Sequence, residues 1–241
     1  MTNTTPDITG IYEVGGHVRD HFLGLVSKDI DYAIECGSFK EMHDWVKLTH
    51  QKVFVVKPEY LTIRALTHTG EPRDYVMCRK DGAYSDARRP DSVEPGTIYD
   101  DLARRDFTVN AIARDVRNKT YLDPHGGIED LNNGRLRCVG DTNARFNEDS
   151  LRILRAIRFS ITKSLTPDAN IQHLLAGNDN LLDHWVERLN NLAESRRLVE
   201  LNKCFYHDTP KTIEFLHQSV HPKLTAAVLG DIWLRPTTAK R

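Results

Sequence analysis

The apolar and polar positions in the first part of the chain alternate with the two-residue period of half-buried β-strands. The clearest example is residues 30–35, where Ile30, Tyr32 and Ile34 point to one face and Asp31 points to the other. Alternating or short apolar runs predict strands at residues 11–14, 30–35, 53–56, 60–66 and 75–78. The first part of the chain is therefore expected to be rich in strands.

Helical periodicity replaces this alternation further along the chain. Leu151, Leu154, Ile157 and Ile161 recur at the three- and four-residue spacing of one helix face. Other helices are predicted at residues 17–23, 39–49, 106–114, 181–206 and 210–219. The last of these has Thr209 at its N-cap and Pro210 in its first turn, a combination that favours a helix start.

The change from strand-like to helix-like patterning lies near residue 140. Residues 80–97 contain many charges and several glycine or proline residues, and they are expected to form a loop. We therefore predict two domains, a mixed α/β domain over residues 1–140 and an all-helical region over residues 141–241.

Composition narrows the class of protein. The chain has 241 residues, of which 28% are charged, and no apolar run is long enough to span a bilayer. Residues 1–6 have neither the basic nor the apolar region of a secretory signal. These features predict a cytoplasmic globular protein that makes no use of a membrane.

Net charge gives no overall signature of nucleic-acid binding, because the formal charge is −1. Residues 135–163 differ from the rest, with seven basic side chains against three acidic ones. This local excess could face the phosphates of a nucleic acid. Charge counting alone leaves a solvated helix face as the alternative.

Two aspartates, Asp29 and Asp31, lie next to the apolar alternation of residues 30–35. If they share one strand face, their Cα atoms are roughly 6–7 Å apart and their carboxylates can converge. Two-metal phosphoryl-transfer sites hold ions about 3.5–4 Å apart and bind them with carboxylates. A lone pair of this kind is more often a solvated strand edge, so the neighbouring residues matter.

Those neighbours are Gly15 and Gly16, which precede the predicted helix at residues 17–23. Glycine lets the backbone approach an anion closely, and a helix start offers free N–H groups. Arg19 can reach the same anion with a forked guanidinium. Alone, the glycine pair predicts only a strand–turn–helix connection, but together with Asp31 it favours a site for a nucleoside triphosphate and divalent metals.

Histidine and cysteine offer a different metal chemistry. His17 and His21 are four residues apart and could share a helix face, but no third ligand is nearby, which favours ordinary surface histidines. The cysteines lack CxxC spacing and are expected to be reduced packing residues: Cys36, Cys78, Cys138 and Cys204.

Five segments in order resemble the class II tRNA nucleotidyltransferases, which are the CCA-adding enzymes, and the related bacterial poly(A) polymerases. The first combines GGHVRD at residues 15–20, LG at 23–24 and DID at 29–31. The others are RKDGAYSDARRP at 79–90, RRDFTVNA at 104–111, DPHGGIEDL at 123–131 and FNEDSLRILRAIRF at 146–159. They extend over about 145 residues, so the resemblance covers most of the chain.

The resemblance implies an α+β fold, in which a polymerase β-like nucleotidyltransferase head with a mixed or antiparallel sheet and flanking helices precedes an all-helical neck. It implies addition of C and A to tRNA 3′ ends from CTP and ATP, with release of pyrophosphate. It also implies two Mg²⁺ ions as cofactors. The expected partners are the 3′ end and acceptor stem of tRNA, together with the two nucleotides.

Site residues follow from the resemblance position by position. The implied catalytic, metal-binding residues are Asp29 and Asp31, with Asp74 as a third acidic residue on a neighbouring strand. The implied triphosphate and ribose contacts are Gly15, Gly16, Arg19, Arg105, Asp106 and Asn110. For the segment around Asp106, helix capping and internal ion pairing are the alternative interpretation.

The resemblance also implies that Asp149 and Arg152 read the nucleobase. On one helix they would be i and i+3 and would share a face. The carboxylate would accept a hydrogen bond from cytosine N4 or adenine N6, and the arginine would donate to the ring acceptor beside it. Arg155 and Arg158 would continue the basic stripe toward the base or RNA phosphates. Spacing alone favours an ion pair between Glu148 and Arg152.

The chain departs from the family in two places. Residues 195–203 are similar but not identical to a later family signature. Relatives continue through further helical segments that hold tRNA, whereas residues 220–241 leave little room for them. We therefore expect either an unusually short enzyme, such as a viral one, or tRNA binding through fewer contacts or a second subunit.

Other functions stay open at this point. One is a poly(A) polymerase or a partial enzyme that adds only CC or only A. Another is an RNA-binding protein with an inactive site, although the intact pair of aspartates argues against it. A third is a toxin-like transferase that blocks tRNA ends.

Overall fold

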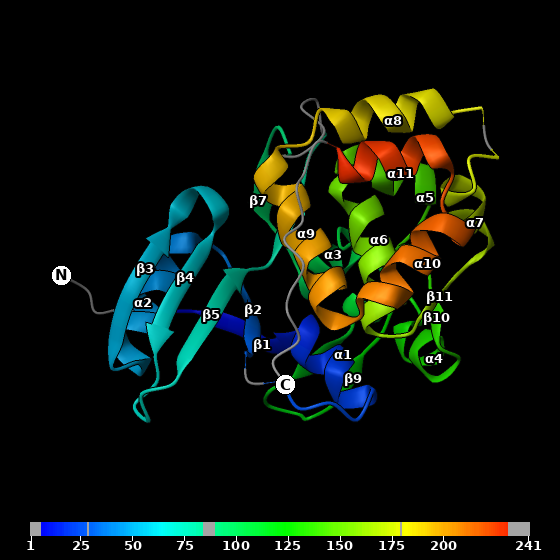
Figure 1. Cartoon of the computed structure of the whole chain (residues 1–241). Helices are drawn as coiled ribbons and strands as arrows, with labels where there is room; N and C mark the ends of the chain where they lie inside the picture. The colour runs from blue at the N-terminus through cyan, green and yellow to red at the C-terminus, as the bar shows by residue number, and fades with distance from the viewer. Residues whose placement is uncertain (1–5, 28, 84–89, 179, 231–241) are drawn as a thin grey trace. The chain divides into compact units, whose positions relative to one another are not determined.

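The computed structural model describes residues 6–27, 29–83, 90–178 and 180–230. These residues form two compact units. The first comprises the described residues up to 83 and residues 90–132, and the second begins at residue 133. Each unit is described separately below, and Figure 1 labels their elements.

The first unit is built on a mixed sheet of seven strands in the order β3-β4-β5-β2-β1-β8-β9. Its neighbouring strands are antiparallel except for β2 and β5, which run parallel. The strands are β1 (Ile8–Val14), β2 (Asp31–Cys36), β3 (Lys52–Lys57), β4 (Thr62–Leu66), β5 (Pro72–Met77), β8 (Ala113–Asp115) and β9 (Tyr121–Leu122). A separate antiparallel pair consists of β6 (Arg79–Asp81) and β7 (Val93–Pro95).

Helices flank this sheet. The helices of the first unit are α1 (Gly16–Phe22), α2 (Phe39–Thr49), α3 (Ile98–Ala103) and α4 (Gly127–Asn132), with 3-10 turns at Pro58–Tyr60 and Thr108–Asn110. The Ser38 side chain caps α2 by accepting a hydrogen bond from the Glu41 N–H. Met42 and Val46 of α2 are fully buried against Ile34 of the sheet, and Figure 1 shows α2 beside β3 and β4.

The second unit is mainly helical. Its helices are α5 (Thr142–Glu148), α6 (Leu151–Thr162), α7 (Ala169–Leu175), α8 (Leu182–Asn190), α9 (Glu194–His207), α10 (Thr209–Ser219) and α11 (Pro222–Leu229). Helix α6 packs against α5, α9 and α10, and its buried face carries Leu154, Ile157 and Ile161. Two-residue strands, β10 (Arg135–Leu136) and β11 (Thr166–Pro167), pair in parallel.

The predicted α+β class is confirmed, and several predicted elements match closely. Helix α2 has the predicted bounds, α1 is shifted by one residue at both ends, and α10 begins one residue earlier than predicted. The helical region is not strictly all-helical, since β11 lies within it. None of the helices in the described part of the chain has the length and apolar character needed to cross a bilayer.

Three predicted elements are wrong. Residues 106–114 contain a 3-10 turn and strand β8 in place of the predicted helix. The prediction failed because every residue from 106 to 113 is buried, and a continuous buried run has no exposed face to reveal its period. Residues 181–206 form two helices, with a break at 191–193. Residues 80–97, expected as a loop, include strands β6 and β7, while positions 84–89 lie outside the described residues.

Candidate active site

Two of the predicted carboxylates meet at the parallel pair of strands in the first unit. Asp31 on β2 and Asp74 on β5 occupy partner positions in the register, so their side chains leave the same face. Asp29 is exposed and precedes β2, so the predicted strand alternation does not extend to it. The structure therefore brings Asp74 beside Asp31 and places Asp29 on the connecting segment.

The electrostatic environment of Asp31 is that of a crowded anionic site. Burial raises the pKa of the Asp31 carboxyl above its ordinary value, and the charge of Asp74 raises the pKa further. Arg105 opposes this shift, and Asp29 adds to it. A cation placed among these carboxylates would relieve their mutual repulsion.

The donor set fits a divalent metal. Carboxylate oxygens are the ligands that Mg²⁺ prefers, usually a few of them together with water and substrate phosphates. Among the described residues, no three His, Cys, Asp or Glu side chains are already assembled around one point. Asp31 and Asp74, with Asp29 next to them, could therefore supply part of a metal site that a substrate would complete.

The glycine turn lies directly beside this carboxylate. Gly15 has a φ of +70°, which L side chains rarely adopt. A Cβ atom there would lie 3.3 Å from Arg105 Nη1 and 3.8 Å from Asp31 Oδ2. At Gly16 a Cβ atom would lie 3.5 Å from Arg19 Nη2. The turn thus places an unobstructed stretch of backbone next to two arginines and one carboxylate.

Arg19 belongs to a buried hydrogen-bond chain. Its Nη1 donates to Asn110 Oδ1 at 2.6 Å, while its Nε and Nη2 both donate to Asp20 Oδ1. Asn110 in turn donates from Nδ2 to Asp106 Oδ1 at 2.9 Å. Asp106 also accepts the backbone N–H of Phe107. The structure therefore joins three residues that were predicted to contact ribose and phosphates, whereas Asp106 does not cap the 3-10 turn that follows it.

Arg105 is held by Asp101, a residue that the sequence interpretation missed. Asp101 is buried and accepts Arg105 Nη2 at 2.8 Å, and it pairs with Arg104 as well. Burial alone would raise the pKa of Asp101, but Arg105 and Arg104 lower it below the ordinary value. Arg105 Nη1 also donates to the Asn110 carbonyl at 3.1 Å. The sequence signal that could have identified Asp101 is its spacing, because Arg104 and Arg105 follow it at i+3 and i+4.

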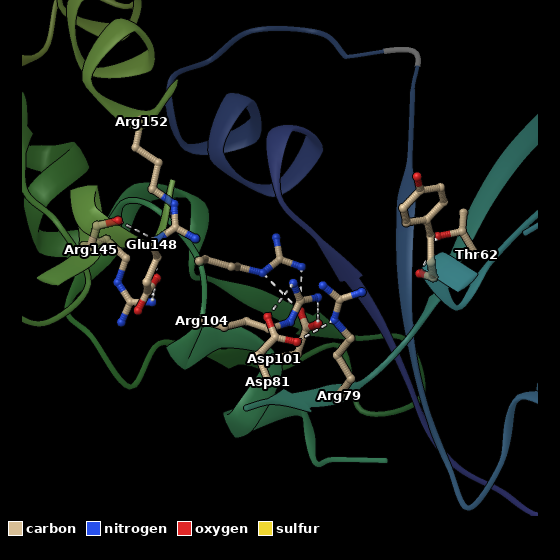
Figure 2. Close-up of polar contacts among 10 residues, drawn as sticks. Thr62, Arg79, Asp81, Asp101, Arg104, Arg145, Glu148 and Arg152 are labelled. Carbon is tan, nitrogen blue, oxygen red and sulfur yellow. Dashed lines mark hydrogen bonds and ion pairs between the residues drawn. The ribbon is translucent and has the colours of Figure 1, made fainter. Parts of the chain in front are cut away.

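A second ion-pair group holds the C-terminal end of α3, the helix that carries Asp101. Arg79 on β6 donates to Asp81 at 2.7 Å, and Arg104 approaches Asp81 to 4.0 Å. Figure 2 shows Arg79, Asp81, Asp101 and Arg104 converging within the first unit. Because Asp81 is almost fully buried, this group anchors the segment that carries Arg105.

In the second unit, the prediction that Asp149 and Arg152 share one helix is wrong. Helix α5 ends at Glu148, Asp149 is extended, and α6 begins at Leu151. The Asp149 carboxylate accepts the Leu151 N–H at 3.0 Å and Arg196 Nη2 at 2.6 Å. The chain breaks between the helices because this carboxylate satisfies a donor at the start of α6.

Arg152 forms the ion pair that spacing alone favoured. Its Nη1 donates to Glu148 Oε2 at 2.6 Å and to the Arg145 carbonyl at 3.0 Å. Arg145 reaches the same glutamate at 2.8 Å, as Figure 2 shows. Glu148, at the end of α5, therefore orients one arginine of α5 and one of α6.

The remaining arginines of the stripe lie along α6. Arg158 pairs with the buried Glu200 of α9, and its guanidinium lies 4.2 Å from the centre of the Phe159 ring. The Arg155 guanidinium lies 5.5 Å from the same ring. Arg196 and Glu200 were missed as site residues, although both lie in the segment at residues 195–203 that resembled a family signature.

His21 and the cysteines show ordinary packing. His21 stacks against Tyr121 with ring centres 6.3 Å apart, and it contacts Phe22 edge-on. His17 and His21 belong to no metal-binding group among the described residues. All four cysteines are buried and free, as expected for packing residues.

Comparison with known proteins identifies a family and several relatives that this chain resembles. The model of the poly(A) polymerase head domain matches residues 11–137. A curated CCA-adding enzyme from Ligilactobacillus salivarius is 36% identical over 201 residues, 83% of this chain and 46% of the relative. The chain thus spans about half the length of the curated relatives it matches.

Solved structures of CCA-adding enzymes also resemble this chain. The CCA-adding enzyme of Bacillus stearothermophilus, in complex with CTP, superposes with a TM-score of 0.74 at 28% identity, covering 91% of this chain and 50% of that one. The Thermotoga maritima enzyme, complexed with tRNA, gives 0.70 at 26%, covering 94% and 50%. Since the family model matches more than half of the sequence, the chain belongs to the family of the poly(A) polymerase head domain.

Proposed function

We propose that this chain is a metal-dependent nucleotidyltransferase that adds C and A to the 3′ end of tRNA, using CTP and ATP. The observation that carries the proposal is the pairing of Asp31 with Asp74 beside the Gly15 turn, within a head domain of this family. Relatives named as CCA-adding enzymes, with structures in complex with CTP and with tRNA, support it.

The reaction forms one bond and breaks another. The 3′-oxygen of the RNA attacks the α-phosphorus of the nucleotide, and the bond to the bridging oxygen breaks, which releases pyrophosphate. Two Mg²⁺ ions, held by Asp29, Asp31 and Asp74, would activate the hydroxyl and neutralise the triphosphate. The protein contributes mainly by positioning and charge stabilisation.

Residues around the glycine turn would hold the nucleotide. The Gly15 and Gly16 backbone lets the triphosphate approach, and Arg105 lies close enough to contact it. Arg19 already orients Asn110, which together with Asp106 would receive the ribose. Because these partners are bonded to one another before substrate binds, little reorganisation is required.

Selection of the base would be the task of the second unit. The Asp149 carboxylate would accept a hydrogen bond from the exocyclic amine of cytosine or adenine, and Arg152 would donate one to the neighbouring ring acceptor. Arg196 occupies one Asp149 oxygen, but a carboxylate offers about four lone-pair positions, so it can accept further bonds. Guanine and uracil present the opposite pattern and would be rejected. Arg155 and Arg158 would extend this surface toward the base or the RNA.

One assay tests the proposal directly. The purified chain is incubated with Mg²⁺, labelled CTP or ATP, and tRNAs that end before C, CC and CCA. We expect the unsubstituted chain to incorporate the labelled nucleotides and the Asp31→Asn variant to incorporate none. Asp44→Asn is the matched control, since Asp44 is an exposed carboxylate on α2 paired with Lys40. Incorporation that persists in the Asp31 variant would contradict the assignment of the site.

A second candidate function is poly(A) addition. It is favoured by the family model itself, which describes a poly(A) polymerase head domain. Product length separates the two functions, because a CCA-adding enzyme stops at a fixed end whereas a poly(A) polymerase extends with ATP alone. A ladder of adenosine products on a sequencing gel, formed without CTP, would establish the second function. Products limited to CC or to A would identify a partial enzyme.

A further inference from the structure

Arg64 on β4 lies beside the carboxylate pair and has no role in the site described so far. The register places Arg64 opposite Asp74, and Asp74 opposite Asp31, so the three side chains leave one face of three adjacent strands. Arg64 Nη2 donates to Asp74 Oδ2 at 2.8 Å, and Arg64 Nε donates to Asp74 Oδ1. This is a two-point fork that occupies both oxygens of the carboxylate.

The positive charge of Arg64 extends beyond this one contact. It interacts with Asp31 and with Asp29 as well as with Asp74. The fork is nevertheless accessible to solvent, with exposed side-chain fractions of 55% for Arg64 and 28% for Asp74. Exposed ion pairs are weak, with a typical contribution of about 0–1 kcal/mol. A competing cation can therefore displace the guanidinium.

We propose that Arg64 is an internal counter-ion, which neutralises Asp74 in the metal-free protein and yields it to the divalent cation. The inference rests on the proposed function, since it assumes a metal at Asp31 and Asp74. The fork places a guanidinium on both Asp74 oxygens, so a metal that binds Asp74 meets a second cation at the same carboxylate and competes with it for the negative charge. Arg64 thus lowers the affinity for a metal that arrives without nucleotide.

Metal binding in the absence of nucleotide tests this inference. Mn²⁺ is titrated into the whole 241-residue chain, and free Mn²⁺ is followed by electron paramagnetic resonance. We expect Arg64→Ala and Arg64→Gln to bind Mn²⁺ about three- to tenfold more tightly than the unsubstituted protein, because the competing fork and its charge are gone. Circular dichroism verifies that each variant is folded.

Arg73→Ala is the matched control. Arg73 lies on β5 next to Asp74 but donates to Glu71 at 2.6 Å, so its removal breaks another ion pair of the same hairpin without freeing Asp74. Its Mn²⁺ affinity should be unchanged. In an Asp74→Asn background, Arg64→Ala should tighten Mn²⁺ binding less than it does in the unsubstituted protein, because the fork is already absent and only the charge of Arg64 near Asp31 and Asp29 is removed.

The outcomes separate this inference from the proposed function. If Asp31→Asn abolishes Mn²⁺ binding but Arg64→Ala leaves the affinity unchanged or weaker, the counter-ion inference is wrong and the metal site stands. If Asp31→Asn binds Mn²⁺ normally, both the metal site and the inference are wrong. If no protein, with or without Arg64, binds Mn²⁺ in the absence of nucleotide, the inference is wrong, and the incorporation assay tests the proposed function separately. Tighter binding by both Arg64 variants, absent in Arg73→Ala, supports the inference.

Discussion

The Arg196 guanidinium lies 2.6 Å from Asp149 Oδ2, which joins two residues 47 positions apart in the chain. Asp149 lies in the break between α5 and α6, where its other oxygen accepts the Leu151 N–H. The carboxylate is therefore fixed from two sides. A group that is to read a base must be held in one orientation, and Arg196 supplies that restraint.

We predict that Arg196→Ala weakens the use of CTP and ATP through a higher KM. A hydrogen bond to a charged group contributes about 1.5–3 kcal/mol, so we expect an increase of about tenfold or more. Steady-state kinetics with each nucleotide measures it. Glu194→Ala is the control, because Glu194 is exposed on the same helix. Equal KM values for the two variants would show that Arg196 does not orient the base-reading carboxylate.

Removing the proposed base-reading pair should relax nucleotide choice. Asp149→Ala or Arg152→Ala is expected to reduce the preference for C and A over G and U by about tenfold, since a good base contact is worth about 1–3 kcal/mol of discrimination. Incorporation from each of the four nucleotides, supplied singly, provides the measurement.

Arg145→Ala is the control for this loss of preference. Arg145 shares the Glu148 partner of Arg152 but has no proposed contact with the base. It should keep the preference for C and A. A base-reading variant that is slower yet equally selective would argue against the role of the pair.

Asp31→Asn should stabilise the metal-free protein at neutral pH. The pKa of Asp31 is raised on folding, mainly by burial and then by Asp74, so the folded state binds its proton more tightly than the unfolded state. The charged carboxylate therefore disfavours folding as pH rises above the ordinary value of about 3.9. Thermal denaturation in EDTA should show a higher Tm for the variant at pH 7, with the gain lost near about pH 3.

Asp44→Asn serves as a control of opposite sign. Lys40 lowers the pKa of Asp44, so its charged form favours folding at neutral pH. Its replacement should leave Tm unchanged or slightly lower at pH 7. A lower Tm for Asp31→Asn at the same pH would mean that Asp31 is stabilised by its neighbours rather than repelled by them.

Gly15→Ala should weaken nucleotide binding in addition to straining the backbone. A side chain at φ +70° strains the chain by about 1–3 kcal/mol, and the new Cβ would press against Arg105 at 3.3 Å. Gly24→Ala isolates the backbone effect, because Gly24 has φ +68° and a Cβ atom added there would meet no atom within 4 Å. Urea unfolding should show both variants destabilised, whereas only Gly15→Ala should raise the KM for nucleotide. A similar KM for the two would exclude a direct role for the turn.

Local pattern was enough to predict several elements. Helix α2 was predicted from residue 39 to residue 49 and has these bounds, and the structure shows that local features define it, with Ser38 as its cap and Met42 and Val46 buried on one face. The glycine turn and the strand that carries Asp31 were likewise readable from neighbours in the chain. Such signals involve residues a few positions apart, so they survive without knowledge of the fold.

Buried segments and ion pairs were harder to predict. Residues 106–113 are buried on all sides, which removes the period that separates a helix from a strand. The break between α5 and α6 was missed because Asp149 there accepts the Leu151 N–H and is also bound by Arg196 of the distant helix α9, a contact that the local pattern does not reveal. In both cases tertiary contacts overrode the local pattern.

The order of residues along the chain is sufficient to predict a glycine turn followed by Asp31 in a strand, the beginnings of a site for phosphate and metal. The family resemblance implied Asp74 on a neighbouring strand, but its position opposite Asp31 and its contact with Arg64 become known only from the folded sheet. This difference arises because strand register is set by burial across the whole sheet. No local run of residues specifies which distant side chains become neighbours.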